Sequence, residues 1–303
     1  MKKLIILSFT MLMVTCLYSQ TAAVFYNNGI TKFKQKDYKG AINEFTKSIS
    51  VNSKLAPTYY NRGNAKYKLL DYKGSISDLD KSIEIDPYIA DSYLLRGNVK
   101  QDLNDILGAT TDYNLAIKIN PNHSKAYYNR GLVKYRVKDY YGAINDFTMA
   151  IDIKPGDAAF YCDRGSSKKE IQDTKGAIDD YLKAIEINPN YANAYKNLGD
   201  VKLSIEDYIG AIAEYNNAIR IDPKFADAYC NRGSAKSKLK DDRGAILDYT
   251  KAIEVNQNLA KAYCNRGISK YILGEKDSGC IDISKAGELG YSYAYEIIKK
   301  YCQ

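Results

Sequence analysis

The sequence predicts an all-α protein built as a solenoid of stacked helix–turn–helix repeats, and three observations support this prediction. A glycine recurs every 34 residues without an insertion, which is a period typical of such solenoids. Within each interval the apolar residues follow helical spacing, and five of the intervals close on a proline. The recurring glycines are Gly29, Gly63, Gly97, Gly131, Gly165, Gly199, Gly233 and Gly267.

The stretch from Ser124 to Pro155 shows why one repeat should hold two helices. Its second half carries an apolar stripe at helical spacing, made by Ala143, Ile144, Phe147, Ala150 and Ile151. Pro155 follows where a helix must stop. A polar break separates this half from a first half centred on Gly131. Because a glycine inside a helix costs about 1 kcal/mol relative to alanine, its regular return predicts close contact between the two helices.

One helix pair cannot cover its own apolar stripe, so the repeats should stack into one elongated domain. The first and last repeats depart most from the pattern, as expected for the two ends of a stack. A helix over 291–302, with Tyr295, Ile298 and Cys302 on one face, is predicted to cap the last repeat. The eight predicted repeats span 22–55, 56–89, 90–123, 124–157, 158–191, 192–225, 226–259 and 260–293.

Charged residues recur at fixed distances from the glycine. The residue before it is arginine in six repeats, the third residue after it is lysine in all eight, and each second helix carries an acid at one position. We predict an Arg–Lys–acid cluster that fixes the register of each pair; the alternative is solvated charges worth about 0–1 kcal/mol per pair. The arginines are Arg62, Arg96, Arg130, Arg164, Arg232 and Arg266, and the acids are Glu44, Asp78, Asp112, Asp146, Asp180, Glu214, Asp248 and Asp282.

The repeat resembles the tetratricopeptide repeat (TPR), and the resemblance covers about nine-tenths of the chain. It rests on Tyr127, Gly131, Ala143, Phe147, Ala150 and Pro155, which stand in the order of the family pattern. The resemblance implies a right-handed α-solenoid whose first helices line a concave face that binds proteins or peptides. Two departures recur: arginine mostly replaces the family's leucine before the glycine, and lysine replaces its tyrosine three residues after it.

The resemblance also implies which side chains face a bound peptide. Asparagine offers donors and acceptors to a peptide backbone, and tyrosine offers flat contact area at low entropic cost. Equivalent positions carry Leu94, Leu95, Cys162, Cys230 and Cys264, which we therefore expect to be exposed. The candidate binding residues are Tyr26, Asn27, Tyr60, Asn61, Asn64, Tyr67, Tyr128, Asn129, Tyr135, Lys196, Asn197, Asn231, Lys261 and Asn265.

Two alternatives apply to this face. Each asparagine could instead form a hydrogen bond between helices and support the stack. Lys196, Asn231 and Lys261 match three positions of a clamp that some family members use for a C-terminal carboxylate. Asp200 stands where that clamp has asparagine, and Asn265 where it has arginine. Because Asp200 would repel a carboxylate, we do not expect the clamp to form.

Residues 1–19 lie outside the repeats. Lys2 and Lys3 precede a short apolar run that ends near Ser19, a pattern typical of a secretory signal peptide. We predict cleavage after Ser19 and export to the periplasm, the cell envelope or the medium, with no stable membrane span left. The alternative is a lipoprotein signal cut before Cys16, which the preceding residues fit poorly.

The cysteines support separate expectations. Cys280 and Cys302 should lie close, since the capping helix should fold over the helix that carries Cys280. They could form a disulfide in an exported protein or remain two thiols packed in the core. Cys230 and Cys264 occupy the same position in neighbouring repeats, about 9–10 Å apart at the usual helix spacing. That distance is beyond disulfide reach.

The sequence favours binding over catalysis. It has no glycine-rich phosphate loop, nucleophile elbow or paired-histidine motif, and its one histidine, His123, falls in a turn between repeats. We therefore predict no enzyme activity, cofactor or metal. The net charge of +8 is modest, and acids beside the repeated basic residues argue against nucleic-acid binding. We predict a scaffold for a protein or peptide partner; the alternative is a chaperone-like carrier of many polypeptides, and self-association stays open.

Overall fold

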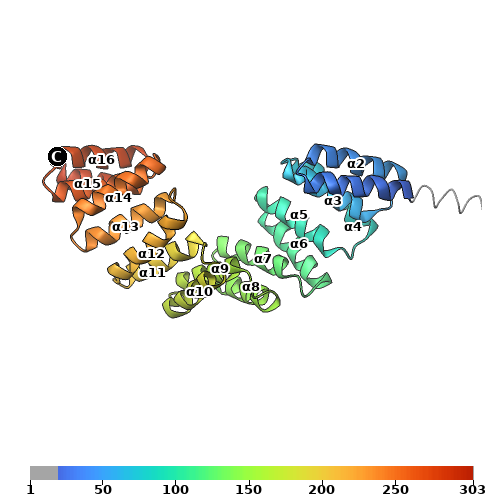
Figure 1. Ribbon diagram of the computed structural model, residues 1–303, viewed down its shortest axis with the longest axis horizontal. Helices are drawn as coiled ribbons and strands as arrows, with labels where there is room; N and C mark the ends of the chain where they lie inside the picture. The colour runs from blue at the N-terminus through green and yellow to red at the C-terminus, as the bar shows by residue number, and fades with distance from the viewer. Residues whose placement is uncertain (1–19, 303) are drawn as a thin grey trace, which may run out of the picture. The chain divides into compact units, whose positions relative to one another are not determined.

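A computed structural model describes residues 20–302, so the predicted signal peptide and Cys16 lie outside the described part of the chain. The described residues form helices joined by short turns, with no strand among them. The chain forms two compact units, an N-terminal half that ends at Ile153 and a C-terminal half that begins at Lys154. Figure 1 shows that each half is a series of helix pairs, which confirms the predicted all-α class.

In the N-terminal half, a helix over residues 20–34 pairs with α2, and each later odd-numbered helix pairs with the even-numbered helix that follows it. We call the two members the first and second helix of a pair. The bounds are α2 (Tyr38–Val51), α3 (Ala56–Lys68), α4 (Tyr72–Ile85), α5 (Ala90–Asp102), α6 (Ile106–Ile119), α7 (Ser124–Arg136) and α8 (Tyr140–Ile153).

The C-terminal half continues the same arrangement and ends in a helix without a second member. Its helices are α9 (Ala158–Glu170), α10 (Thr174–Ile187), α11 (Ala192–Ser204), α12 (Tyr208–Ile221), α13 (Ala226–Lys238), α14 (Asp242–Val255), α15 (Ala260–Ile272), α16 (Lys276–Glu288) and α17 (Tyr293–Tyr301).

The turn inside each pair repeats one backbone conformation. In the turn between α7 and α8, Lys138 has a φ of 66°. The next residue, Asp139, accepts a 3.0 Å hydrogen bond at Oδ1 from the backbone N–H of Gly142 and so caps α8. The left-handed conformation costs most residues about 1 kcal/mol or more, and Gly274 avoids that cost between α15 and α16. The other residues with this conformation are Lys36, Leu70, Asn104, Gln172, Glu206 and Lys240.

The recurring glycine marks the closest approach of the two helices in a pair. A Cβ atom on Gly97 would lie 2.6 Å from the ring of Tyr113, which is fully buried on α6. Gly131 has the same relation to Phe147, at 2.7 Å. The side chain that alanine would add therefore collides with the aromatic ring of the second helix, which confirms the predicted close contact.

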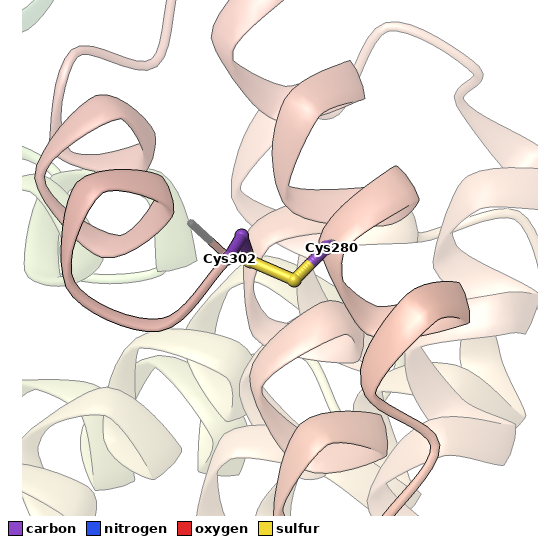
Figure 2. Close-up of a disulfide and its surroundings, with 2 residues drawn as sticks. All are labelled: Cys280 and Cys302. Carbon is purple, nitrogen blue, oxygen red and sulfur yellow. A yellow bond between two sulfur atoms is a disulfide. The ribbon is translucent and has the colours of Figure 1, made fainter.

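α17 packs against α16 and closes the C-terminal end of the stack. It buries Ala294 and Ile297, which are three residues apart and set its packed face. Tyr295 also meets α16, since its ring lies beside Gly287 and its hydroxyl donates a hydrogen bond to the Gly287 carbonyl, although the side chain is 60% exposed. A disulfide joins Cys280 on α16 to Cys302, with their Cα atoms 5.7 Å apart (Figure 2).

The predicted charge clusters are confirmed as ion pairs between the two helices of a pair. Asp112 on α6 is only 1% exposed and receives Arg96 Nη2 at 2.6 Å and Lys100 Nζ at 2.8 Å. Where the first helix has no arginine, lysine alone reaches the acid. The complete clusters centre on Asp78, Asp112, Asp146, Asp180, Asp248 and Asp282, and the lysine-only clusters on Glu44 and Glu214.

The same arginines also reach the preceding pair, which the sequence analysis did not anticipate. Arg96 directs Nη1 to Asp80 on α4 at 2.6 Å, while its Nε and Nη2 bind Asp112 on α6. Arg130 joins Asn114 and Asp146 in the same way. One guanidinium therefore links three successive helices, and its planar, forked donors suit that task better than a lysine ammonium would.

Replacing Asp112 with asparagine should destabilise the fold by about 3 kcal/mol, because Arg96 and Lys100 would keep their charges without a carboxylate. Urea unfolding followed by circular dichroism measures this loss. The matched control is Glu84→Gln, which breaks the exposed Lys81–Glu84 pair and should cost less than about 1 kcal/mol. Equal losses in the two variants would show that the buried cluster does not hold the pair together.

Candidate binding surface on the first helices

The first helices of successive pairs lie close together. In the N-terminal half α3 contacts α5 and α5 contacts α7; in the C-terminal half the contacts run from α9 through α11 and α13 to α15. Among residues 20–302, no second helix makes comparable contact with the next second helix. Since the pairs spread apart on the second-helix side, the first helices line the inner side of each half. We call this inner side the first-helix surface.

In the N-terminal half, tyrosines and asparagines occupy this surface. The tyrosines are half-buried. Most of their rings contact an aromatic of the second helix, as Tyr128 contacts Phe147 at 5.7 Å between ring centroids, while Tyr60 packs beside Leu79 of α4. The helix over 20–34 carries Tyr26 and Asn27, of which Asn27 is exposed. α3 and α7 carry the other predicted binding residues of this half: Tyr60, Asn61, Asn64, Tyr67, Tyr128, Asn129 and Tyr135.

Two of these tyrosines are held as neutral phenols. Burial raises the pKa of Tyr60 to about 12, and the charge of Asp91 adds to that effect. Tyr67 donates a 2.7 Å hydrogen bond to Asp102, at the end of the neighbouring first helix α5. Burial and this carboxylate both raise the pKa of Tyr67. The surface of the N-terminal half therefore offers neutral hydroxyls and amides.

The residue directly after the recurring glycine accepts a hydrogen bond from the asparagine of the next first helix. Asn98 Oδ1 accepts hydrogen bonds from Asn129 Nδ2 of the next first helix, at 2.7 Å, and from the hydroxyl of Tyr113, at 2.9 Å. Asp200 Oδ1 receives Asn231 and Tyr215 in the same arrangement, each at 2.9 Å. In the same way, Ser166 Oγ accepts a hydrogen bond from Asn197 at 3.4 Å, and Ser234 Oγ accepts one from Asn265 at 3.2 Å.

These bonds give the asparagines a supporting role between first helices. Asn61 also bonds to the preceding first helix, but its partner there is the hydroxyl of Tyr26, which accepts a 3.1 Å hydrogen bond from Asn61 Nδ2. An amide has two N–H donors and two acceptor lone pairs, so one bond to a neighbouring helix leaves capacity for a ligand. Ser166 and Ser234 were not predicted as partners of the asparagines. Both directly follow the recurring glycine, and this shared position could have identified them.

The two predicted binding lysines of the C-terminal half, Lys196 and Lys261, are connected through Asp200 and Asn231. Lys196 on α11 lies 2.8 Å from Asp200 Oδ2, and Lys261 on α15 donates to Asn231 Oδ1 at 3.1 Å. Asp200 therefore neutralises Lys196 in place and would oppose a bound carboxylate. This geometry agrees with the expectation that the carboxylate clamp does not form.

The cysteines at the equivalent positions do not face solvent. Cys162, Cys230 and Cys264 are free thiols but buried, so the prediction that they are exposed is wrong. A cysteine side chain ends below the surface at a position where a tyrosine ring reaches past it, and the same burial applies to Leu94 and Leu95. Burial raises the pKa of these thiols to about 12 for Cys162 and about 11 for Cys230 and Cys264.

No group of three His, Cys, Asp or Glu side chains within residues 20–302 is placed to hold a metal ion. No helix of that range is long and apolar enough to cross a membrane. The histidine, His123, sits at the start of α7 with Nε2 3.1 Å from Asp91, and this contact lowers the pKa of Asp91 despite its partial burial.

Comparison with protein families gives consistent matches along both halves. The family model described as "Tetratricopeptide repeat" matches residues 56–88, 90–123 and 226–259. A related model, "TPR repeat", matches residues 168–205 and 199–240. No curated protein matches the chain at a significant level.

Several solved structures share the fold. MamA is 28% identical, with a TM-score of 0.50 over 57% of this chain and 94% of its own. YrrB, described as a TPR protein with an unusual peptide-binding site, is 22% identical, with a TM-score of 0.51 over 61% of this chain and 95% of its own. A tetratricopeptide repeat protein from Parabacteroides merdae is 18% identical, with a TM-score of 0.64 over 82% of this chain and 99% of its own.

Replacing Asn129 with alanine should lower the free energy of unfolding by about 1 kcal/mol, because the hydrogen bond to Asn98 is lost. The control is Asn27→Ala, at the same position of the helix over 20–34, where the side chain is exposed and the described residues provide no preceding first helix. Both changes alter helix propensity equally, so the difference between them in urea unfolding isolates the bond. Equal effects would mean that Asn129 does not support the stack.

Proposed function

Because this chain belongs to the tetratricopeptide repeat family, we propose that it is a non-catalytic scaffold that holds a protein or peptide segment on its first-helix surface. The observation that carries this proposal is the row of tyrosines and asparagines in the N-terminal half, on the helix over 20–34, α3 and α7. These side chains combine apolar contact area with hydrogen-bonding groups, which is the chemistry that a polypeptide backbone requires.

The surface is already organised before a partner binds. The rings of Tyr26, Tyr128 and Tyr135 each contact a second-helix aromatic at an angle, with centroid distances of 6.0, 5.7 and 5.5 Å. Asn61 and Asn129 are held by their bonds to the preceding first helix. Side chains that are fixed in advance lose little entropy on binding, so more of the contact energy becomes affinity.

The chemistry of the N-terminal half favours an uncharged, extended segment. Its tyrosine hydroxyls stay neutral, since the pKa of Tyr60 is raised to about 12, and its asparagine amides carry no charge. Backbone N–H and C=O groups of an extended peptide match such donors and acceptors. Tyrosine rings beside them supply the apolar contact that tyrosine commonly gives at protein interfaces.

We test this by placing a photoreactive benzoylphenylalanine at Tyr60 or Tyr128 and crosslinking in intact cells. The expected result is covalent capture of one protein at near-stoichiometric yield. The control position is Asn145, which is exposed on the second helix α8 and should capture little. Capture of many unrelated polypeptides would favour the chaperone-like carrier, and equal labelling at all three positions would contradict a binding surface on the first helices.

We also propose that the protein is exported, on the basis of the Lys2–Lys3 head and the apolar run before Ser19. The Cys280–Cys302 disulfide supports this proposal because such bonds persist in oxidising compartments. Sequencing the N-terminus of the protein isolated from cells tests it. Gln20 is the expected first residue; a start at a lipid-modified Cys16 would replace this proposal with the lipoprotein alternative, and a start at Met1 would exclude cleavage.

A further inference from the structure

Turns inside three successive pairs of the N-terminal half expose large apolar side chains. The turn between α3 and α4 carries Leu69 and Leu70. The turns between α5 and α6 and between α7 and α8 carry Leu103 and Val137, and Leu107 and Tyr141 follow in the first turns of α6 and α8. Leu70, Leu107 and Tyr141 are 71%, 80% and 70% exposed. Apolar groups that gather on one part of a surface commonly mark an interaction site. We call these turns, with the turn at 34–40 before them, the turn edge.

The turns form one continuous surface within this half. A hollow of about 500 Å³ lies between the first two, and its lining includes Leu70 and Lys73 on one side and Leu103 on the other. The hydroxyl of Tyr67 reaches Asp102 across the same junction. Arg136 donates a hydrogen bond to Asn104 and so joins the next two turns.

Leu70 breaks the pattern of its position. Its φ of 62° is left-handed, and every other described pair has a polar residue or glycine at this place in the turn. At 71% exposed, this leucine gains little packing within the chain to offset its strain. Such a local conflict often marks a functional position, and here it indicates that the leucine meets a partner outside the chain.

Basic side chains flank the exposed apolar ones in the turns between α3 and α4 and between α7 and α8, whereas the turn between α5 and α6 has none beside Leu103 or Leu107. Lys68 and Lys73 lie on either side of Leu69 and Leu70, Arg136 and Lys138 on either side of Val137, and the first turn adds Lys34, Lys36 and Lys39. The acids between them are mostly engaged. Asp102 accepts the Tyr67 hydroxyl, and the helix-capping aspartates bind backbone N–H groups where the helix dipole offsets their charge; these are Asp37, Asp71, Asp105 and Asp139.

We propose that the turn edge docks on an anionic lipid surface. Leu70, Leu107 and Tyr141 would enter the headgroup layer, while the lysines meet lipid phosphates, which is how amphipathic basic surfaces bind membranes. The side chains project from three separate turns and differ in size. A bilayer accommodates such projections without matching pockets, whereas a folded protein partner would need a complementary pocket for each.

The C-terminal half provides an internal comparison. Its turn between α11 and α12 also exposes Ile205 and Ile209, but Glu206 stands where the N-terminal half has Lys138. That turn retains the apolar groups and lacks the basic ones, so it should not bind anionic lipid.

The chain contains no tryptophan, so a single introduced tryptophan reports its own surroundings. Because residues 1–19 would themselves bind lipid, the experiment uses the chain from Gln20 onward, which includes every described residue. With phosphatidylglycerol vesicles, the fluorescence of Leu69→Trp should shift to shorter wavelength. The matched control, Ile205→Trp at the same position of a C-terminal turn, should not shift, and neither variant should shift with phosphatidylcholine vesicles.

Vesicle sedimentation then tests the apolar groups. The double change Leu70→Asn with Leu107→Asn removes two exposed apolar side chains without changing the charge, so folding should be kept and binding should fall at least tenfold. Ile209→Asn, at the position of Leu107 in a C-terminal pair, should leave binding unchanged. Failure of the parent chain to bind phosphatidylglycerol vesicles, or equal binding to phosphatidylcholine, would overturn the proposal. A shift of Leu69→Trp that appears only with a purified protein partner would also overturn it, and neither outcome affects the first-helix surface.

Discussion

The rest of the structure depends on one interaction, the ion pair between a buried carboxylate and an arginine that also contacts the preceding helix pair. Arg96 binds Asp112 of its own pair and Asp80 of the pair before it. That second contact adds a fixed polar link between neighbouring pairs, beside the apolar packing and the asparagine bonds that also join them. Such buried ion pairs add little net energy compared with apolar packing, and their main effect is to specify one arrangement.

That fixed arrangement positions the two surfaces on which we base function. On the first-helix surface, each asparagine bonds to the residue that follows the glycine of the previous pair, as Asn129 does to Asn98. This bond requires a constant offset between first helices. At the turn edge, the same offset brings Leu70 and Leu107 onto one side of the N-terminal half. A repeating scaffold thus presents different chemistry on different sides, since the positions that hold the stack together are distinct from those that vary.

The features that depend on one repeat could be predicted from the sequence. The contact at Gly97 and the Arg96–Lys100–Asp112 cluster follow from spacing on two adjacent helices. Features that depend on neighbouring repeats could not be predicted in the same way. The bond from Arg96 to Asp80 and the partners of Asn197 require the offset between pairs, and the burial of Cys230 depends on how far a side chain extends past its neighbours.

Hydrogen–deuterium exchange of the Arg96→Met variant tests this account most directly. The guanidinium is removed while Asp112 keeps Lys100 as a partner, so the pair itself should persist. The account predicts faster amide exchange in α5 and α6 and also in α4, which Arg96 reaches only through Asp80. Faster exchange confined to α5 and α6, with α4 unchanged, would contradict the claim that arginine links one pair to the next.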